Sequence, residues 1–258
     1  MKQAYWFLFY QDNLLLKKDG FTRSVPYSAE PPLPTQGKTV HTLSPLDGIP
    51  CYTYALDNYQ EETEQYQMVG LRASYDYLPL PFYQAAGKAR QILHWDRNSR
   101  FCPACGVPTL QTTPICKQCP QCKQEFYPVI HTAIIVLIRR GNSILLVHAR
   151  NFKGNFHGLV AGFLEVGETL EDCVRREVME ETGLTIKNIS YFGSQSWPYP
   201  SGLMTGFIAD YESGELNLQK EELSTGCFFT KEHLPEIPKK LSIARKMIDW
   251  WLEQQKEQ

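Results

Sequence analysis

Acidic side chains crowd a short stretch in the second half of the chain. The 23 residues from Gly162 to Leu184 contain seven acidic side chains and two arginines. Apolar residues at helical spacing predict a helix over 169–182, on which Glu177, Glu180 and Glu181 share one face. Like charges at this spacing repel by a few tenths of a kcal/mol per pair, and a divalent cation between them would reverse the repulsion. Helical spacing alone leaves two interpretations open, a site for Mg²⁺ or Mn²⁺ and a solvated acidic face.

A second cluster consists of cysteines. Five of the eight cysteines fall between residues 102 and 122. Four of these form two CxxC turns, Cys102-Pro-Ala-Cys105 and Cys119-Pro-Gln-Cys122, with thirteen residues between them. Four thiolates at this spacing can surround one Zn²⁺ and leave no open coordination position, which predicts one structural zinc ion per chain. Cys116 forms a further CxxC with Cys119, but the pair Cys119 and Cys122 repeats the proline of the first turn. Local disulfides, free core thiols and a redox switch are the alternatives.

The acidic stretch resembles the Nudix box at nine positions with fixed spacing: Gly162, Glu168, Arg176, Glu177, Val178, Glu180, Glu181, Gly183 and Leu184. The resemblance implies a Nudix hydrolase, an α/β/α sandwich that cleaves a diphosphate linked to another moiety with Mg²⁺ or Mn²⁺. It also implies that Glu177, Glu180 and Glu181 hold the metal. Arg176 would orient a glutamate by a charged hydrogen bond, and Glu168 would support the site.

Two further features resemble the NADH pyrophosphatase subfamily of these enzymes. One is the four-cysteine ribbon directly before the box, and the other is Ser194-Gln-Ser-Trp-Pro-Tyr-Pro200, similar to the subfamily signature Ser-Gln-Pro-Trp-Pro-Phe-Pro. Ser196 replaces a proline and Tyr199 a phenylalanine. Gly202 stands where the subfamily commonly has serine, so that the small polar residue, Ser201, is displaced by one position.

The subfamily resemblance also implies a substrate site. Tyr127 and Phe163 would enclose the nicotinamide in a dimeric pocket, and core packing is the alternative for both rings. Gln195 and Trp197 would contact substrate, where Trp197 is expected in a stiff aromatic loop, again with core packing as the alternative. Ala244, near the last helix, would also contact substrate. Glu222 would contribute a metal ligand, with its neighbour Glu221 as the competing assignment.

The remaining elements predict an α/β protein with three domains. Residues 1–96 are expected to be β-rich, residues 97–128 to form the zinc ribbon and residues 129–258 the Nudix domain with a mixed sheet. The pattern predicts a hairpin from strands 5–10 and 13–17, and helices over 83–96, 169–182 and the C-terminus. Later strands are expected at 133–138, 144–148, 186–192, 203–211 and 227–229. We find no internal sequence repeat.

Composition narrows the class of protein. The 258 residues carry a formal net charge of −2, which argues against nucleic-acid binding by bulk positive charge. The longest apolar run, 133–138, is far shorter than the ~18 residues that a membrane helix needs. Clustered rather than dispersed cysteines favour a reducing cytoplasm.

The resemblance therefore implies a metal-dependent hydrolase that splits NADH or NAD⁺ into nicotinamide mononucleotide and AMP, acts as a homodimer and also removes NAD caps from RNA 5′ ends. One alternative is a Nudix hydrolase for another substrate, such as ADP-ribose, a dinucleoside polyphosphate or an oxidised nucleotide. Another is an inactive zinc-ribbon RNA-binding protein, which the complete set of box glutamates disfavours.

Overall fold

The computed structural model describes residues 2–151 and 154–255, and these form two compact units. The N-terminal unit runs to Val129 and also includes Pro198–Ser201. The C-terminal unit holds Ile130–Trp197 and the chain from Gly202 onward. No helix within the described residues is long and apolar enough to cross a membrane.

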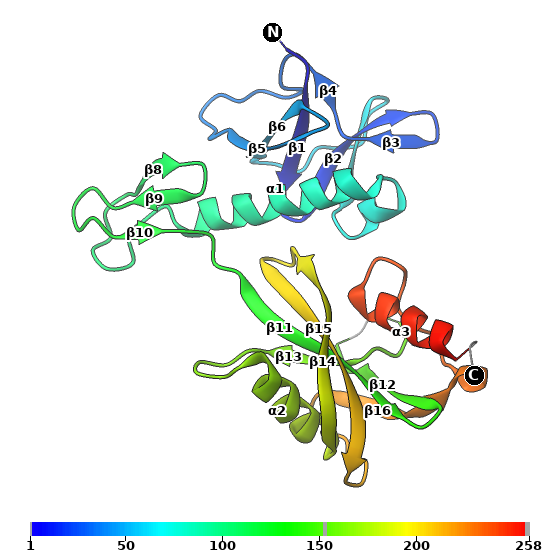
Figure 1. Cartoon of the computed structure of the whole chain (residues 1–258). Helices are drawn as coiled ribbons and strands as arrows, with labels where there is room; N and C mark the ends of the chain where they lie inside the picture. Colours follow the sequence, from blue (N-terminus) through cyan, green and yellow to red (C-terminus); the bar gives the residue numbers. More distant parts are fainter. Residues whose placement is uncertain (1, 152–153, 256–258) are drawn as a thin grey trace. The chain divides into compact units, whose positions relative to one another are not determined.

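The N-terminal unit contains a seven-stranded sheet, and its strand order is β3-β2-β1-β6-β5, with β4 paired to β1 and β7 to β2 (Figure 1). Its strands are β1 (Ala4–Tyr10), β2 (Asn13–Asp19), β3 (Thr22–Ser24), β4 (Tyr27–Ser28), β5 (His41–Leu46), β6 (Ile49–Ala55) and β7 (Tyr66–Gly70). The predicted hairpin is present, since Tyr10 in β1 pairs with Asn13 in β2. Gln11 makes the turn between them with a φ of 52°. Leu8, Leu15 and Tyr54 are fully buried in one core cluster of this sheet.

One long helix follows the sheet. A short 3-10 turn, η1 (Ala73–Asp76), precedes α1 (Leu80–Asn98), which starts after Pro79 and packs against β1, β5 and β6. Beyond α1 lies a separate three-stranded sheet of order β10-β9-β8, built from β8 (Leu110–Thr113), β9 (Cys116–Gln118) and β10 (Glu125–Phe126). This small sheet carries the cysteine cluster.

The C-terminal unit is a six-stranded mixed sheet between two helices (Figure 1). The strand order is β14-β15-β11-β12-β16, with β13 paired to β11, and β11 runs parallel to β15 while the other pairs are antiparallel. The strands are β11 (His131–Arg140), β12 (Ser143–Ala149), β13 (Val160–Phe163), β14 (Thr185–Trp197), β15 (Gly202–Ser213) and β16 (Leu223–Thr230). The helices are α2 (Leu170–Thr182), η2 (Lys231–His233) and α3 (Ile243–Gln254).

Strand β11 shows why the unit has three layers. Its residues alternate between two cores, because successive side chains of a strand point to opposite faces. Ile134, Val136 and Ile138 pack with the buried face of α2, whereas Ile135 and Leu137 pack with α3. The α2 side of the core includes Cys173, Val174 and Val178, and the α3 side includes Met247, Ile248 and Trp251. The predicted α/β/α sandwich is therefore confirmed.

Both ends of α2 follow from local sequence. The Thr169 hydroxyl accepts a hydrogen bond from the Asp172 backbone N–H at 3.2 Å and so caps the first turn. Gly183 ends the helix in the left-handed conformation, with φ 70°, and its N–H donates to the Met179 carbonyl. The predicted span of 169–182 differs from the observed helix by its capping residue alone.

One expectation about local structure was wrong. Trp197 does not lie in a loop, because β14 continues as far as this residue and pairs antiparallel with β15. Ser196 pairs with Leu203 and Trp197 with Gly202. A serine brings a backbone N–H that the subfamily's proline lacks, so this chain can extend the ladder by these residues.

Candidate active site and zinc site

The Nudix-box residues surround the junction between β13 and α2. Phe163 ends β13, a short loop carries Glu165 and Glu168, and α2 then presents Arg176 and Glu177. Gly162 in β13 lies against the Glu177 side chain so closely that a Cβ on Gly162 would be 1.9 Å from the Glu177 Cδ. The glycine therefore provides the space in which the Glu177 carboxylate sits.

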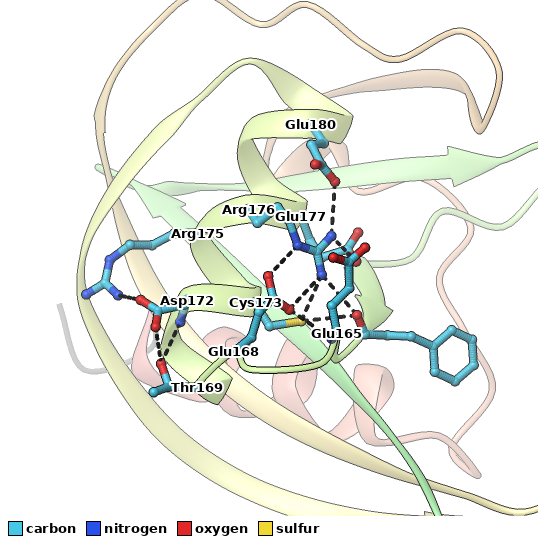
Figure 2. Close-up of polar contacts among 10 residues, drawn as sticks. Glu165, Glu168, Thr169, Asp172, Cys173, Arg175, Arg176, Glu177 and Glu180 are labelled. Carbon is cyan, nitrogen blue, oxygen red and sulfur yellow. Dashed lines mark hydrogen bonds and ion pairs between the residues drawn. The ribbon is translucent and has the colours of Figure 1, made fainter.

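Arg176 is the centre of the site (Figure 2). Its Nε and Nη2 donate to the two Glu168 carboxylate oxygens at 2.5 and 3.0 Å, a two-pronged charged hydrogen bond. Its Nη1 donates to Glu177 Oε1 at 2.9 Å and to Glu180 Oε2 at 3.0 Å. Its Nη2 also donates to the Phe163 carbonyl at 3.0 Å. One guanidinium thus ties α2 to the loop and to the end of β13.

Glu168 also holds the loop. Its Oε2 accepts a hydrogen bond from the Glu165 backbone N–H at 2.9 Å. The Arg176 guanidinium and this backbone donor lower the pKa of Glu168 to about 2, so the carboxylate stays ionised at neutral pH. Its contacts are with Arg176 and the loop, which fits a supporting role.

Glu181 has the opposite environment. The residue is 4% exposed, and no hydrogen bond or ion pair reaches its carboxylate from the part of the chain that the structure describes. Burial, followed by the charges of Glu177, Glu222 and Glu180, raises its pKa to about 8. Burial also raises the pKa of Glu177, although Arg176 opposes this shift. The structure therefore brings Glu222, from the loop before β16, into the same acidic cluster.

This cluster fits divalent cations by its donor set. Three carboxylates, those of Glu168, Glu177 and Glu180, share the one guanidinium of Arg176. The charges of Glu177, Glu180 and Glu222 act on the buried Glu181 carboxylate, so the cluster holds five carboxylates. A buried carboxylate without a partner is costly unless a charge joins it, and oxygen-rich clusters are what Mg²⁺ and Mn²⁺ bind. The glutamates are less tightly gathered than the cysteines. Among the described residues, four cysteines form a group of possible metal ligands whose donor atoms all lie within 4.8 Å of one another, and the glutamates do not meet this criterion.

The cysteine cluster consists of Cys102, Cys105, Cys119 and Cys122. The Sγ atoms of Cys102 and Cys122 are 3.5 Å apart, as are those of Cys105 and Cys119. These distances are too long for a disulfide and near the ~3.8 Å edge of a tetrahedron with Zn–S bonds of about 2.3 Å. All eight cysteines are free, so the alternative of local disulfides is wrong. Cys116 lies outside the cluster and is buried.

The two cysteine turns have the same backbone structure. In each, the residue after the second cysteine, Gly106 or Lys123, has a positive φ and donates its N–H to the carbonyl of the first cysteine. The N–H of that first cysteine donates in turn to Val107 or Gln124. Two matching turns face their four thiols toward one another, the arrangement that a structural zinc ion requires.

The residues expected to contact the nicotinamide are exposed. The Tyr127 side chain in the N-terminal unit is 52% exposed and Phe163 in the C-terminal unit is 66% exposed. The Tyr127 hydroxyl donates to Glu125 at 3.0 Å. Core packing is therefore not the explanation for these two rings.

Two of the other expected substrate residues, Gln195 and Ala244, lie at the start of α3. Ala244 is 7% exposed in the first turn of this helix. The Gln195 side-chain Nε2 donates to the Leu241 carbonyl at 2.9 Å, just before the helix begins, a contact that the sequence did not indicate. Trp197 is partly buried at the end of β14.

The burial of Glu181 could be predicted from the apolar residues of α2, although the spacing of the box glutamates alone does not indicate it. Val174, Val178 and Glu181 are spaced by four and three residues, so they lie along one stripe of α2. That stripe is the buried face of the helix. A carboxylate at a core position of an amphipathic helix is itself a sign of a functional site.

Comparison with known proteins agrees with this geometry. Residues 129–251 match the family described as NUDIX domain, and residues 3–95 match the NADH pyrophosphatase-like rudimentary NUDIX domain. The chain is 38% identical over 255 residues to the NAD-capped RNA hydrolase NudC of Haemophilus influenzae (strain PittEE), covering 97% of this chain and 93% of that one. It is 42% identical over 193 residues to the protein of the same name from Vibrio parahaemolyticus, covering 74% of each chain. A solved NUDIX hydrolase structure from Nitrosomonas europaea is 22% identical with a TM-score of 0.49, covering 62% of this chain and 94% of that one. On the sequence relatives and the two matched domains, the chain belongs to the NADH pyrophosphatase subfamily of the Nudix hydrolases.

Proposed function

We propose that this protein hydrolyses the diphosphate linkage of NADH and NAD⁺, yielding nicotinamide mononucleotide (reduced or oxidised) and AMP, and that it removes NAD caps from RNA 5′ ends by breaking the same bond. The observation that carries the proposal is the complete acidic cluster around Arg176 in a chain that shares 38% identity over nearly its whole length with an NAD-capped RNA hydrolase.

The proposed mechanism assigns separate tasks to the cluster. Four glutamates would hold Mg²⁺ or Mn²⁺, namely Glu177, Glu180, Glu181 and Glu222. Arg176, itself held by Glu168, keeps Glu177 and Glu180 in place. When bound, such ions offset the charge of the diphosphate and lower the pKa of an attacking water. A glutamate of the cluster accepts the proton of that water. The buried position of Glu181 favours this chemistry, because a carboxylate with little access to water interacts strongly with an ion.

The departures from the subfamily pattern at Gly202 and Ser196 have structural explanations. A Cβ at Gly202 would lie 3.2 Å from the carbonyl oxygens of His131 and Trp197, so a larger residue is crowded there. The neighbouring Ser201 is 4% exposed, and its hydroxyl donates to the Val129 carbonyl at 2.7 Å. Ser196 joins the β14–β15 ladder. These roles weaken the argument that the departures signal a different substrate.

A substrate panel tests the proposal. The purified protein with Mg²⁺ or Mn²⁺ is given NADH, NAD⁺, ADP-ribose, a dinucleoside polyphosphate and an NAD-capped RNA. We expect the highest kcat/KM on NAD(H) or on the capped RNA, with AMP or a 5′-monophosphate RNA as product. Faster hydrolysis of ADP-ribose or the polyphosphate than of both NAD substrates would contradict it.

Zinc, domain organisation, dimerisation and location are part of the same proposal. Residues 97–128 would form a zinc ribbon between domains 1–96 and 129–258, supported by the separate β10-β9-β8 sheet and the four gathered thiols.

Two chains would form a homodimer, supported by the exposed rings of Tyr127 and Phe163. Eight free thiols suit a reducing cytoplasm. Light scattering of the zinc-bound protein would test the dimer directly.

A further inference from the structure

The segment 194–200, which resembles the subfamily signature, is divided between the two units. Strands β14 and β15 lie in the C-terminal unit, but Pro198–Ser201, which connect them, lie in the N-terminal unit. The connection contacts Tyr83, Gly87 and Val129, which belong to the same unit.

The main contact joins two tyrosines that are 116 residues apart in sequence. The Tyr199 hydroxyl lies 2.5 Å from the hydroxyl of Tyr83 in α1. The Tyr83 side chain is 6% exposed, and burial raises the pKa of both hydroxyls, so both remain protonated at neutral pH. The Arg72 guanidinium stacks over the Tyr199 ring at 4.7 Å from its centroid.

The neighbouring residues of the connection are packed just as closely. Pro198 is buried against Gly87 of α1, where an added Cβ would be 3.1 Å from the Pro198 Cγ. A glycine within a helix costs about 1 kcal/mol relative to alanine, so its place here has a packing reason. Ser201 closes the other end of the connection through its bond to the Val129 carbonyl.

We propose that Tyr199 is a positioning residue, whose bond to Tyr83 holds the β14–β15 connection and so fixes the backbone that joins Trp197 to Gly202. The tyrosine that replaces the subfamily's phenylalanine gains a hydroxyl, and Tyr83 supplies its partner. This role rests on the proposed function, because its consequence is substrate affinity. The acidic cluster on α2 is formed by other residues, so loosening the anchor should change KM more than kcat.

The test compares Tyr199→Phe, Tyr83→Phe and the double variant with Tyr77→Phe, a half-exposed tyrosine of the same unit whose hydroxyl has no partner among the described residues. Tyr199→Phe leaves the buried Tyr83 hydroxyl without this bond, and Tyr83→Phe removes the same bond from its other end. Either change predicts a KM for NADH raised about 5- to 10-fold with kcat within about 2-fold. The double variant removes both hydroxyls, so its effect should be smaller than the sum of the two. Tyr77→Phe should behave as wild type.

Hydrogen exchange gives a readout that does not depend on activity. Amides of the segment 194–204 should exchange faster in both single variants than in wild type or Tyr77→Phe. Unchanged exchange, or faster exchange with an unchanged KM, would overturn the positioning role. Absence of NADH turnover by the wild-type protein would instead overturn the proposed function, and the exchange data would still decide whether the anchor exists.

Discussion

The Glu177 carboxylate occupies the space that any side chain on Gly162 would need. A Cβ atom on Gly162 would lie 1.9 Å from Glu177 Cδ and 2.0 Å from Oε1, well inside van der Waals contact. Because α2 is fixed by its buried face against the sheet, the carboxylate rather than the helix would have to move. The backbone of β13 thereby determines where this acidic group can lie.

Gly162→Ala should therefore impair catalysis more than folding. Displacing Glu177 by about 1 Å predicts a loss in kcat/KM of about 100-fold, with a folded, zinc-containing protein. Gly193→Ala is the matched control, since a Cβ there meets nothing within 4 Å. Steady-state kinetics and thermal unfolding of both variants check this, and wild-type activity in Gly162→Ala would show that the Glu177 position does not matter.

Arg176→Lys should fail although it keeps the charge. A single ammonium cannot reproduce the paired bonds to Glu168 together with those to Glu177 and Glu180. Loss of such a positioning partner predicts a fall of about 10- to 100-fold in activity or metal affinity. Arg175→Lys on the same helix is the control, because Arg175 contacts the exposed Asp172 at 3.3 Å. Equal activities of the two variants would contradict the role assigned to Arg176.

Glu181 should make the metal-free protein less stable as pH rises. Its pKa is about 8 in the folded protein against 4.5 for an ordinary glutamate, so between these values the folded state holds more protons than the unfolded state. Stability should thus fall from about pH 5 to pH 8, by at most about 1.4 kcal/mol per pH unit.

Thermal midpoints with and without Glu181→Gln measure this effect. The difference between the two proteins isolates Glu181 from His157, whose pKa burial lowers and which titrates in the same range with the opposite sign. Added Mg²⁺ or Mn²⁺ should raise the wild-type midpoint more at pH 8 than at pH 5, because the carboxylate must lose its proton to bind metal. A pH-independent difference would contradict the assigned environment of Glu181.

Zinc content should distinguish Cys122 from Cys116, the two cysteines that could each complete a CxxC turn with Cys119. Cys122→Ala should lose the zinc ion and lower the unfolding temperature of the protein, because a structural zinc site contributes directly to folding. Cys116→Ala should keep one zinc per chain, since Cys116 lies outside the gathered thiols. Metal analysis of both purified variants decides the matter, and zinc loss from Cys116→Ala alone would reverse the assignment.

Some strands were predictable because their pattern is local. The run Ala133–Ile138 is apolar at every position, as expected of a strand buried on both faces, and β11 contains it. Strand β5 was missed because Pro45 interrupts its pattern, and an edge strand can accommodate a proline. Strand β13 was missed because its four residues include Gly162, which weakens any strand signal.

The site was predictable to the extent that fixed spacing encodes it. The box residues place Glu177 and Glu180 next to Arg176 through helix geometry alone. Glu222 joins them through the tertiary fold, and the subfamily resemblance indicated it where spacing could not. No sequence signal pairs Tyr83 with Tyr199, since their contact depends on how the connection after β14 packs. Residues 3–95 match a rudimentary NUDIX domain, and this match could not be predicted because the sequence shows no internal repeat.

The most direct test of the proposed site is NADH hydrolysis by wild type, Glu177→Gln and Glu171→Gln with Mg²⁺ or Mn²⁺, with products separated by chromatography. Glu171 is an exposed glutamate on the same helix and serves as the matched control. We predict AMP and reduced nicotinamide mononucleotide from wild type and Glu171→Gln, and a loss of at least about 100-fold in Glu177→Gln. Undiminished turnover by Glu177→Gln, or products from cleavage of another bond, would contradict the proposed site.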